Sequence, residues 1–482
     1  METNCTTHDD YIAECDALRR MGGRLMTVFA EEPVDGMYTV NALFAGDGEV
    51  FRVHFDTEGD VPSLTGIVPY AGCHERMMAE MSGVTIDGAV PAPIVYRRRG
   101  GGHPLQKSPC DIGSEERIPL PKNSTAGDGV FEIPVGPVHA GIIEPGHFRF
   151  SVAGETVLEL NPSLGYTHRG VERLLELPVG EDKSRLVERI SGDTCVANSI
   201  AYAEMMESGS SIPRRAVRIR TMLAEMERLY NHIGAVSGIC TDTAFSVPSA
   251  IGGGIMEKVL RMNLALTHHR QLMNAVVPGG IRWDIGESTL RDLDDFLIGL
   301  KFEVDALEEM MMESPSLQDR METTGRLEPS VARDIGATGP IGRASGVPVD
   351  CRREFGYEAY GDLGMNMPVQ TGGDVLARTK VRFAEITESF SLIHQCIQNM
   401  EPGETRVHVE PEDGFYCSVV EAPRGELVHS MHVRGGRIWR YHVCDPSFRN
   451  WFGMCYAVPG NVVPDFPLIN KSFGLSYSGN DL

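Results

Sequence analysis

The fold of this chain of 482 residues is predicted from two neighbouring stretches, GPVHAGIIEPGHFRF at residues 136–150 and YTHRGVERLLE at residues 166–176. Around them, VFEIPVGP from residue 130 and FRFSVAGETVLEL from residue 148 are rich in strand-forming residues. They predict paired strands, with a turn around Ala153 and Gly154. A sheet is therefore expected directly before the helical part of the chain.

Four long segments with helical periodicity follow this sheet. In each segment apolar residues recur on one face, and such a stripe is what packing into a helical bundle requires. The chain after residue 407 has only short apolar runs and predicts short strands and loops. The four segments expected to form helices are residues 214–236, 255–276, 287–311 and 374–399.

The N-terminal part of the chain alternates short apolar runs with turn residues. YTVNALFAGDGEVFRVHF at residues 38–55 has a Gly-Asp-Gly turn between two apolar segments and predicts a hairpin. Helices are expected at residues 16–23 and 74–83. The predicted fold class is α+β in three parts: a small α+β domain at 1–96, a Gly- and Pro-rich linker or surface extension at 97–130, and a second domain at 131–482.

The composition excludes several functions. A net charge of −23 opposes binding to nucleic acid, because nothing offsets repulsion from the phosphates. No run of roughly 18 or more uncharged apolar residues occurs, so no segment is expected to span a bilayer. The 11 cysteines form no C-x-x-C pair and the N-terminus lacks a secretory signal, which predicts reduced thiols in the cytoplasm. Any link to a membrane must then come through partner subunits.

The two opening stretches, together with further motifs in the same order, resemble the large-subunit family shared by group 4 nickel–iron hydrogenases and complex I. The residues of these motifs are most similar to those of the formate hydrogenlyase branch. HERMMAEMSG at 74–83 and GGHPLQKS at 101–108 resemble the 30-kDa subunit of complex I. The further large-subunit motifs are ERISGD (188–193), ERLYNHI (227–233), PGGIRWD (278–284), GPIGRASG (339–346), EAPRGE (421–426) and DFPLINKSFGLSYSGNDL (465–482). The resemblance implies a hydrogenase large-subunit fold with a central bundle of long helices and peripheral hairpins, preceded by a 30-kDa-like domain.

The resemblance also implies that the metal ligands of a hydrogenase are missing. Active nickel–iron hydrogenases hold their metals with two C-x-x-C pairs, since soft thiolates bind nickel and bridge it to iron. The first pair falls on Ser191 and Thr194 in this sequence, and the second on Ser476 and Gly479. Cys195 follows one residue too late. No nickel–iron centre and no other metal is expected in this chain.

Complex I relatives use the same cavity for a quinone headgroup. They place a histidine on the first hairpin and a tyrosine in the segment that matches ERISGD. Those positions are Ile143 and Gly192 here, so the usual quinone-binding pair is also absent. His139 lies on the same hairpin, either as a quinone contact or as a structural hydrogen-bond donor. Quinone binding therefore stays open as an alternative.

Some charged residues of the family motifs are retained. Arg169, next to His168, matches an arginine that in relatives lies beside the terminal iron–sulfur cluster of the small subunit. The alternative is an ion pair of Arg169 with Glu172 or Glu176 on its own helix. Glu172 matches a glutamate implicated in proton movement, and near Arg169 and His168 it can relay protons or form a fixed ion pair.

Arg424 matches the arginine that overhangs the metals in hydrogenases. Without metals it can pair with Asp193 or meet an anionic substrate. The sequence thus predicts a subunit without a nickel–iron centre, peripheral at the cytoplasmic membrane, that couples electron transfer to ion translocation. Its expected partners are a small subunit with a four-iron four-sulfur cluster, a ferredoxin-like subunit and antiporter-like membrane subunits. The alternatives are a quinone-reducing subunit, an oxidoreductase for another small substrate, and a structural scaffold.

Overall fold

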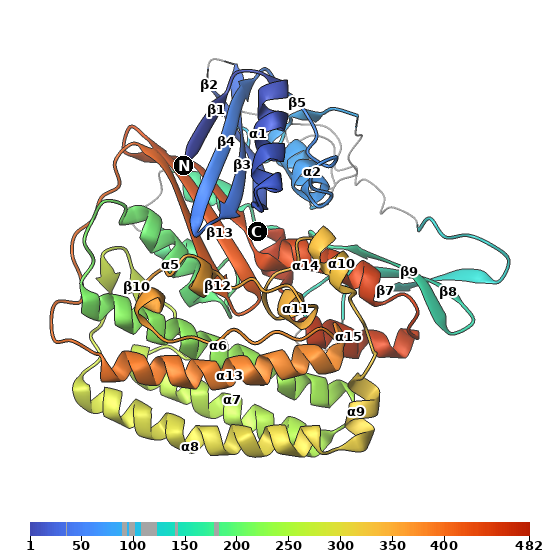
Figure 1. Cartoon of the computed structure of the whole chain (residues 1–482), viewed down its shortest axis with the longest axis vertical. Helices are drawn as coiled ribbons and strands as arrows, with labels where there is room; N and C mark the ends of the chain where they lie inside the picture. The colour runs from blue at the N-terminus through green and yellow to red at the C-terminus, as the bar shows by residue number, and fades with distance from the viewer. Residues whose placement is uncertain (35, 89–93, 96–101, 108–122, 140–142, 178–182) are drawn as a thin grey trace.

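The computed structural model describes the chain except for residues 35, 89–93, 96–101, 108–122, 140–142 and 178–182. Helices and strands are mixed without regular alternation, which confirms the α+β class. Figure 1 shows a sheet with two helices at the top, long helices at the bottom and a hairpin that projects to the right. The predicted boundary at residue 96 and most of the predicted linker lie outside the described residues.

The N-terminal unit is a four-stranded sheet with two helices. Strand order is β1-β4-β3-β2, with β1 parallel to β4 and the other pairs antiparallel. The predicted hairpin is β3 and β4, and its turn places Asp47 and Gly48 at positive φ. A two-stranded parallel pair, β5 and β6, flanks α2. The elements are β1 Glu2–Cys5, α1 His8–Arg20, β2 Arg24–Val34, β3 Met37–Gly46, β4 Glu49–Thr57, β5 Asp60–Val61, α2 Ala71–Ser82 and β6 Thr85–Ile86.

This unit shares part of its core with the rest of the protein. Leu25 and Val28 of β2 pack under α1 and α2, whereas Met26 and Phe29 belong to the main apolar cluster of the molecule. Successive side chains of a strand point to opposite faces of the sheet, and an irregularity in the pairing between Leu25 and Thr27 shifts this alternation, so that Leu25 and Val28 lie on the same face. Lys107 lies 3.6 Å from the centre of the Trp439 ring, so a described part of the predicted linker contacts the C-terminal sheet.

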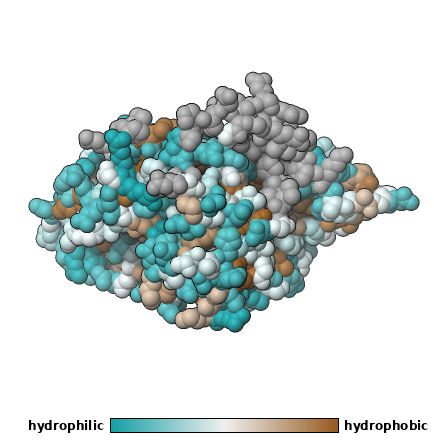
Figure 2. Space-filling model, turned by 90° about the horizontal axis from the view of Figure 1, so that it is seen from above, coloured by the Kyte–Doolittle hydropathy of each residue, from teal (hydrophilic) through white to brown (hydrophobic). Residues whose placement is uncertain are grey.

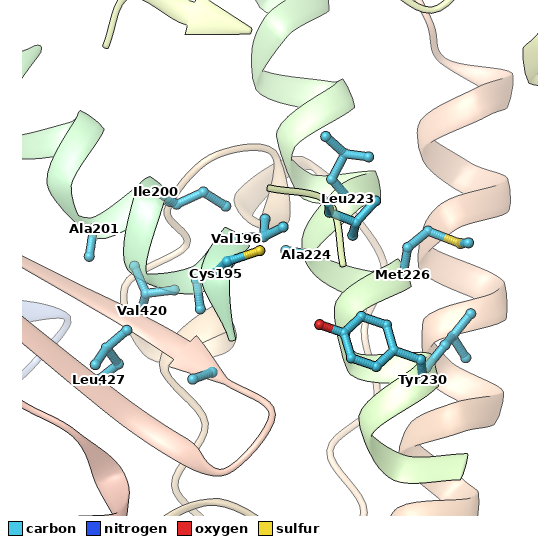
Figure 3. Packing of buried hydrophobic residues seen from close by; sticks show 14 of the residues in the cluster. Cys195, Val196, Ile200, Ala201, Leu223, Ala224, Met226, Tyr230, Val420 and Leu427 are labelled. Carbon is cyan, nitrogen blue, oxygen red and sulfur yellow. The ribbon is translucent and has the colours of Figure 1, made fainter. Parts of the chain in front are cut away.

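The long helices form the predicted bundle. They are α6 Arg214–Asp242, α7 Ser246–Thr267, α8 Glu287–Met312 and α13 Val375–Gln398. In α8 the apolar stripe faces the interior and the acidic residues face outward. Helix α6 is buried along most of its length, at the centre of the bundle. Figure 3 shows how α5, Cys195–Met206, which the periodicity did not predict, packs Val196 and Ile200 against α6.

The second predicted helix was placed wrongly along the chain. Helix α7 begins nine residues earlier than expected, at Ser246 rather than 255, with Pro248 near its start, and ends at Thr267. His268 then adopts φ 60°, which stops the helix. The apolar residues at 276–277 instead form β10, Val276–Val277, which pairs with β11, Gly280–Ile281. The turn between them needs Gly279, since a side chain there would lie 1.9 Å from the Val407 carbonyl oxygen.

The projecting hairpin is the predicted sheet before the bundle. Strands β7 Val130–Val135, β8 His147–Ala153 and β9 Thr156–Ser163 pair antiparallel in the order β7-β8-β9. The turn between β8 and β9 lies at Gly154 as expected. Phe148 and Phe150 of β8 point into a second apolar cluster that joins the hairpin to the C-terminal helices.

The expectation of short strands and loops after residue 407 is wrong. Strands β12 Gly414–Ala422, β13 Gly425–Arg434 and β14 Arg437–Cys444 form a long antiparallel sheet. Helices α14 Pro446–Ala457, α15 Phe466–Phe473 and α16 Tyr477–Asp481 follow. Most residues of β13 and α14 are buried on every side, so no regular alternation or stripe marks them in the sequence.

Shorter elements connect these parts. None of the helices in the described ranges has the length and apolar character needed to cross a membrane. Figure 2, which views the molecule from the side of the N-terminal sheet, shows a mostly hydrophilic face with small scattered apolar groups. The remaining elements are α3 Val171–Glu176, α4 Ser184–Val187, α9 Pro315–Met321, α10 Pro329–Asp334, α11 Gly339–Ala344, α12 Cys351–Glu354 and the 3-10 turns Tyr360–Asp362 and Val463–Asp465.

Candidate functional site

The segments that match the two hydrogenase ligand pairs meet in the interior. The Oγ atoms of Ser191, just before α5, and Ser476, at the start of α16, lie 2.9 Å apart although 285 residues separate them. Thr194 and Gly479 are also buried. The fold thus brings all four positions to buried sites at the starts of two helices.

The hydroxyl groups at these positions are engaged with their own surroundings. Ser191 donates to the Asp193 carboxylate over 2.8 Å, so the contact between the two serines is completed by the Ser476 hydroxyl as donor. The Ser476 oxygen accepts from the Gly479 amide at 2.9 Å and caps α16. Thr194 donates to the Ser191 carbonyl at 3.4 Å. These hydroxyls tie helix starts together.

A carboxylate occupies the space that a side chain at position 479 would need. A Cβ atom added to Gly479 would lie 2.6 Å from Oδ2 of Asp445, far inside van der Waals contact. Asp445 is held there because it caps α14 through the Ser447 amide at 2.8 Å. The donors at this site are therefore hydroxyl and carboxylate oxygens. Such hard oxygen donors do not fit a nickel–iron centre, which needs bridging thiolates.

Cys195 does not replace a missing ligand. Its thiol donates to the Gln271 carbonyl and belongs to the apolar cluster between α5 and α6 shown in Figure 3. Burial raises the pKa of this thiol well above its usual value. Glu227 of α6 caps the start of the same helix by accepting from the Val196 and Ala197 amides at 2.7 and 3.0 Å. Burial raises the pKa of Glu227 to about 8.

Arg424 and Asp193 form a two-pronged ion pair beside the serines. Arg424 Nη1 lies 3.1 Å from Asp193 Oδ1, Nη2 contacts Oδ2, and Nε donates to the Gly474 carbonyl at 2.7 Å. Burial would raise the pKa of Asp193, but the Arg424 guanidinium lowers it below the ordinary value. Tyr230 and Asn231, from the ERLYNHI motif, both hold the Asp193 carbonyl at 2.7 Å. Of the two alternatives for Arg424, the structure contains the ion pair with Asp193.

Glu172 contacts residues of β14 and not Arg169 or His168. Its carboxylate accepts from Arg440 and His442 of β14 at 2.9 Å each, and from the Val443 amide at 2.8 Å. Burial alone would raise the pKa of Glu172, but Arg440 and His442 lower it to about 2. The expected grouping of Glu172 with Arg169 and His168 is not formed, and the fixed ion pair is.

Arg169 is exposed and anchored by backbone carbonyls. Its guanidinium donates to the carbonyls of Arg189, Ile190 and Ser478, the last two at 2.8 and 3.2 Å. The ion pair of Arg169 with Glu172 or Glu176 is not present. The ring of His168 contacts the carbonyl of Asp481 at 2.7 Å. Both residues therefore lie where the segment before Ser191 meets the last turn of the chain.

His139 is engaged within its own hairpin. Its Nε2 atom contacts the Gly146 carbonyl at 2.7 Å, as expected for a structural donor. Ile143, which the resemblance predicts to match a quinone-binding histidine, is 39% exposed. Residues 140–142, between them, lie outside the described residues. Gly192 approaches Met273, which lies 3.5 Å from an added Cβ atom.

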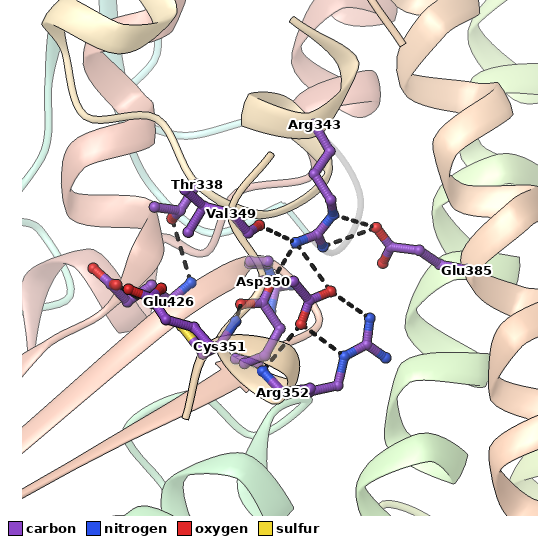
Figure 4. Close-up of polar contacts among 12 residues, drawn as sticks. Thr338, Arg343, Val349, Asp350, Cys351, Arg352, Glu385 and Glu426 are labelled. Atoms are coloured by element: carbon purple, nitrogen blue, oxygen red, sulfur yellow. Dashed lines mark hydrogen bonds and ion pairs between the residues drawn. The ribbon is translucent and has the colours of Figure 1, made fainter. Parts of the chain in front are cut away.

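Sequence reasoning missed a network of buried charges beneath the site (Figure 4). Arg343 of α11 donates to Glu385 of α13 and to Glu421 of β12, each at 2.8 Å. Arg352 pairs with Asp350 at 2.7 Å in the same network. Arg343 and Glu421 lie in motifs that the sequence singled out, but only the fold shows that they are partners. The network joins the bundle to the C-terminal sheet.

Among the described residues, one group of three potential metal ligands lies close together, namely Cys351, Glu354 and Glu426. Arg24 binds both carboxylates, and Arg449 binds Glu426 at 2.6 Å. Guanidinium groups thus neutralise the carboxylates that a cation would need. This group is an ion-pair cluster between the N-terminal unit and the C-terminal sheet.

Comparison with known proteins agrees with the motifs. Residues 248–413 match the model of the respiratory-chain NADH dehydrogenase 49 Kd subunit, and residues 6–110 that of its 30 Kd subunit. Formate hydrogenlyase subunit 5 of Escherichia coli is 30% identical over 96% of this chain and 85% of its own length. Hydrogenase-4 component G of Escherichia coli is 29% identical over 94% of this chain and 82% of its own length. NADH-quinone oxidoreductase subunit 4 of Thermus thermophilus is 29% identical, over 76% and 96%. The chain belongs to the family of the 49-kDa subunit of NADH dehydrogenase and the formate hydrogenlyase large subunit, in the form that carries a fused 30-kDa-type unit.

Proposed function

We propose that this chain is a non-autonomous subunit of a membrane-associated oxidoreductase complex and that it assembles no nickel–iron centre. One observation carries the proposal. The family fold brings the four former ligand positions to the starts of two helices, but their donors are hydroxyls, and Asp445 lies where a side chain at position 479 would be. A scaffold without the ligands supports a role in assembly and coupling rather than in hydrogen chemistry.

The names of the relatives support the wider setting. They are described as subunits of formate hydrogenlyase, of NADH-quinone oxidoreductase and, in Pyrococcus furiosus, of a membrane-bound hydrogenase. By analogy this chain acts with an iron–sulfur small subunit, a ferredoxin-like subunit and antiporter-like membrane subunits at the cytoplasmic face of the membrane. Electron transfer at the small subunit's four-iron four-sulfur cluster is then coupled to ion translocation by the membrane subunits.

The exposure of Arg169 supports docking of the small subunit at this face. Its guanidinium is held by three carbonyls next to both ligand-position segments and forms no ion pair with the carboxylates of α3. A fixed cation at a subunit boundary stabilises a reduced, more negative cluster across it. Arg169 is therefore proposed as the residue that faces the cluster of the partner.

The contacts of Arg424 and His139 bear on two alternatives, an oxidoreductase for another small substrate and a quinone-reducing subunit. Arg424 is engaged by Asp193 and the Gly474 carbonyl, so it offers no open cation to an anionic substrate. His139 is engaged by the Gly146 carbonyl, and quinone binding stays a prediction of the resemblance. The scaffold role differs from the proposal only in the effect of Arg169, which can be measured.

The test is purification of the complex from its native cells through a tag on this chain. An iron–sulfur protein should copurify in equal amount, with the electron paramagnetic resonance signal of a reduced four-iron cluster, and nickel should stay at background. Nickel bound in a one-to-one ratio to this chain, or hydrogen evolution by the complex, would contradict the proposal.

A matched pair of variants separates coupling from scaffolding. Arg169→Gln should lower the reduction potential of the copurifying cluster, because a nearby positive charge is lost. Arg185→Gln removes an exposed arginine on the neighbouring helix α4 and should leave that potential unchanged. Equal potentials in both variants and the parent complex would favour the scaffold role.

A further inference from the structure

A row of polar side chains crosses from the second domain into the N-terminal unit. Glu172 contacts Nδ1 of His442 at 2.9 Å, and Nε2 of His442 contacts the Thr27 hydroxyl at 2.8 Å. The same hydroxyl lies 3.4 Å from Nδ1 of His74 on α2. All four side chains are buried. The fused N-terminal unit thus supplies two members of a chain that ends on a carboxylate of the second domain.

The direction of the hydrogen bonds in this row follows from Glu172. Its carboxylate is ionised and paired with Arg440, so it accepts, and His442 must donate through Nδ1–H. Burial lowers the pKa of His442, which leaves its Nε2 as an acceptor for the Thr27 hydroxyl. The Thr27 oxygen then accepts from Nδ1–H of His74. Every proton in the row points toward Glu172.

The far end of the row is an acceptor without a donor. Nε2 of His74 is buried and has no hydrogen-bond partner among the described residues. His74 lines a cavity of about 20 Å³, together with Asp445 and Asn480. A single water molecule needs about 10–15 Å³ and two to four polar partners, and this cavity meets both needs. The positive charges that face His74 are Arg449 and, if it is protonated, His442.

A second, larger cavity lies beside this one. A larger cavity of about 270 Å³ lies between α2, β9 and α14 and shares Phe448 and Asn480 with the small one. Its lining includes Arg76, Asn161 and Trp451. The two cavities are therefore neighbours, with the side chains of Phe448 and Asn480 in the lining of both.

We propose that the small cavity binds one water molecule that donates to Nε2 of His74, and that this water and the row carry a proton from the larger cavity to His442. An excess proton on the water forms N–H at His74 Nε2, while His74 gives its Nδ1 proton to Thr27 and Thr27 gives its own to His442 Nε2. The water is left neutral, and His442 becomes an imidazolium. Glu172 faces that imidazolium and compensates its charge, while Arg440 is the opposing cation.

The inference is independent of partner subunits and is tested on the full-length chain labelled with 15N-histidine. Nuclear magnetic resonance should show His74 and His442 as neutral Nδ1–H tautomers, assigned with His74→Gln and His442→Gln. A water cross-peak is expected at His74. As the pH is lowered, exchange of His442 between its neutral and imidazolium forms, measured by broadening of its 15N signals, should be kept in Thr27→Ser and should slow in Thr27→Val.

Three results would each overturn the inference. An Nε2–H tautomer of His74 would reverse the direction of the row. A high-resolution structure of the full chain with an empty small cavity would remove the water. Exchange at His442 that is equal in Thr27→Val and Thr27→Ser would show that protons reach His442 by another route. Valine keeps the volume of threonine whereas serine lacks its methyl group, so damage to packing would be greater in Thr27→Ser and could not by itself slow exchange only in Thr27→Val.

Discussion

At the scale of single residues, buried arginines form ion pairs with buried carboxylates in the interior of this protein. Arg343 has no exposed surface and holds Glu385 and Glu421, which are equally buried. Removing one partner of such a set leaves a charge in a medium that cannot solvate it, which costs far more than the intact set contributes. The buried arginines are therefore expected to be the most sensitive single positions in the fold.

We expect Arg343→Met to lower the free energy of unfolding by about 3–5 kcal/mol, because two carboxylates lose their cation. Arg326→Met is the control, since Arg326 and Glu328 form a pair in which both side chains are 53% exposed. That exposed pair should contribute less than about 1 kcal/mol. Urea unfolding measures both, and equal losses would show that burial of the network does not matter.

The acidic side chain of Glu204 should make stability fall with rising pH. Burial, helped by the charge of Glu358, raises the pKa of Glu204 to about 8, against the opposing effects of Ser418 and Arg220. The unfolded chain releases this proton near the ordinary carboxyl pKa. Folding therefore holds a proton that the unfolded state has lost, and stability declines between those two pKa values.

Glu204→Gln keeps a hydrogen-bond acceptor for Ser418 but cannot titrate. The parent chain should lose stability between about pH 5 and about pH 8. We expect this loss to be smaller by about 1–3 kcal/mol in Glu204→Gln, as measured by urea unfolding at each pH. Glu322→Gln, at an exposed position, should leave that loss unchanged. A loss in Glu204→Gln as steep as in the parent chain would mean that Glu204 is already ionised when folded.

At the scale of elements, the positions predicted to match the hydrogenase ligand pairs lie at a junction of helix starts. Asp445 caps α14, Ser476 caps α16, and the two meet where Gly479 leaves room for the carboxylate. Glu227 holds the start of α5 close by, by accepting from the Val196 and Ala197 amides. Helix starts carry free amide donors, and oxygen side chains satisfy them.

Gly479→Ala should lower the free energy of unfolding by about 1–3 kcal/mol, because its Cβ atom meets the Asp445 carboxylate. Serine at position 445 can still cap α14 but is shorter. In the Asp445→Ser background, Gly479→Ala should therefore cost clearly less, and a double-mutant cycle by urea unfolding measures the coupling. Additive losses would mean that Asp445 does not fill the space of a side chain at 479.

At the scale of the whole molecule, the N-terminal unit and the remainder share an apolar core. Phe29 stacks on the His442 ring with centroids 4.3 Å apart, and Arg24 joins Glu426 and Glu354 across the same boundary. A unit that shares its apolar core with its neighbour gains stability from it, so local opening should spread across the boundary.

Phe29→Ala should cost about 3–5 kcal/mol and weaken both sides of the boundary. Hydrogen exchange measured by mass spectrometry should lose protection in β2 and in β12–β14 together. The control is Phe51→Ala, which packs against the N-terminal cluster and not against the shared one. It should affect only the N-terminal unit. If Phe29→Ala also leaves β12–β14 protected, the two parts are energetically separate.

Periodic and turn patterns predicted much of the fold, because they depend on nearby residues. The stripe of α8 and the Gly-Asp-Gly turn of the β3–β4 hairpin are local signals, and both are confirmed. The bounds of α7 and the length of the strands β12–β14 were predicted wrongly. His268 ends α7 by a backbone conformation, and the strands lack alternation because both of their faces are covered.

The sequence by itself determined the fold class and the family, and residue identity alone says that Ser191, Thr194, Ser476 and Gly479, the positions predicted to match hydrogenase ligands, offer no thiolate. Only the tertiary structure decided which groups those positions and Glu172 meet. Asp445 beside Gly479 is a contact across 34 residues, and His442 beside Glu172 a contact across 270. Such contacts depend on how the sheet and helices pack, and nothing in the local order of residues encodes them.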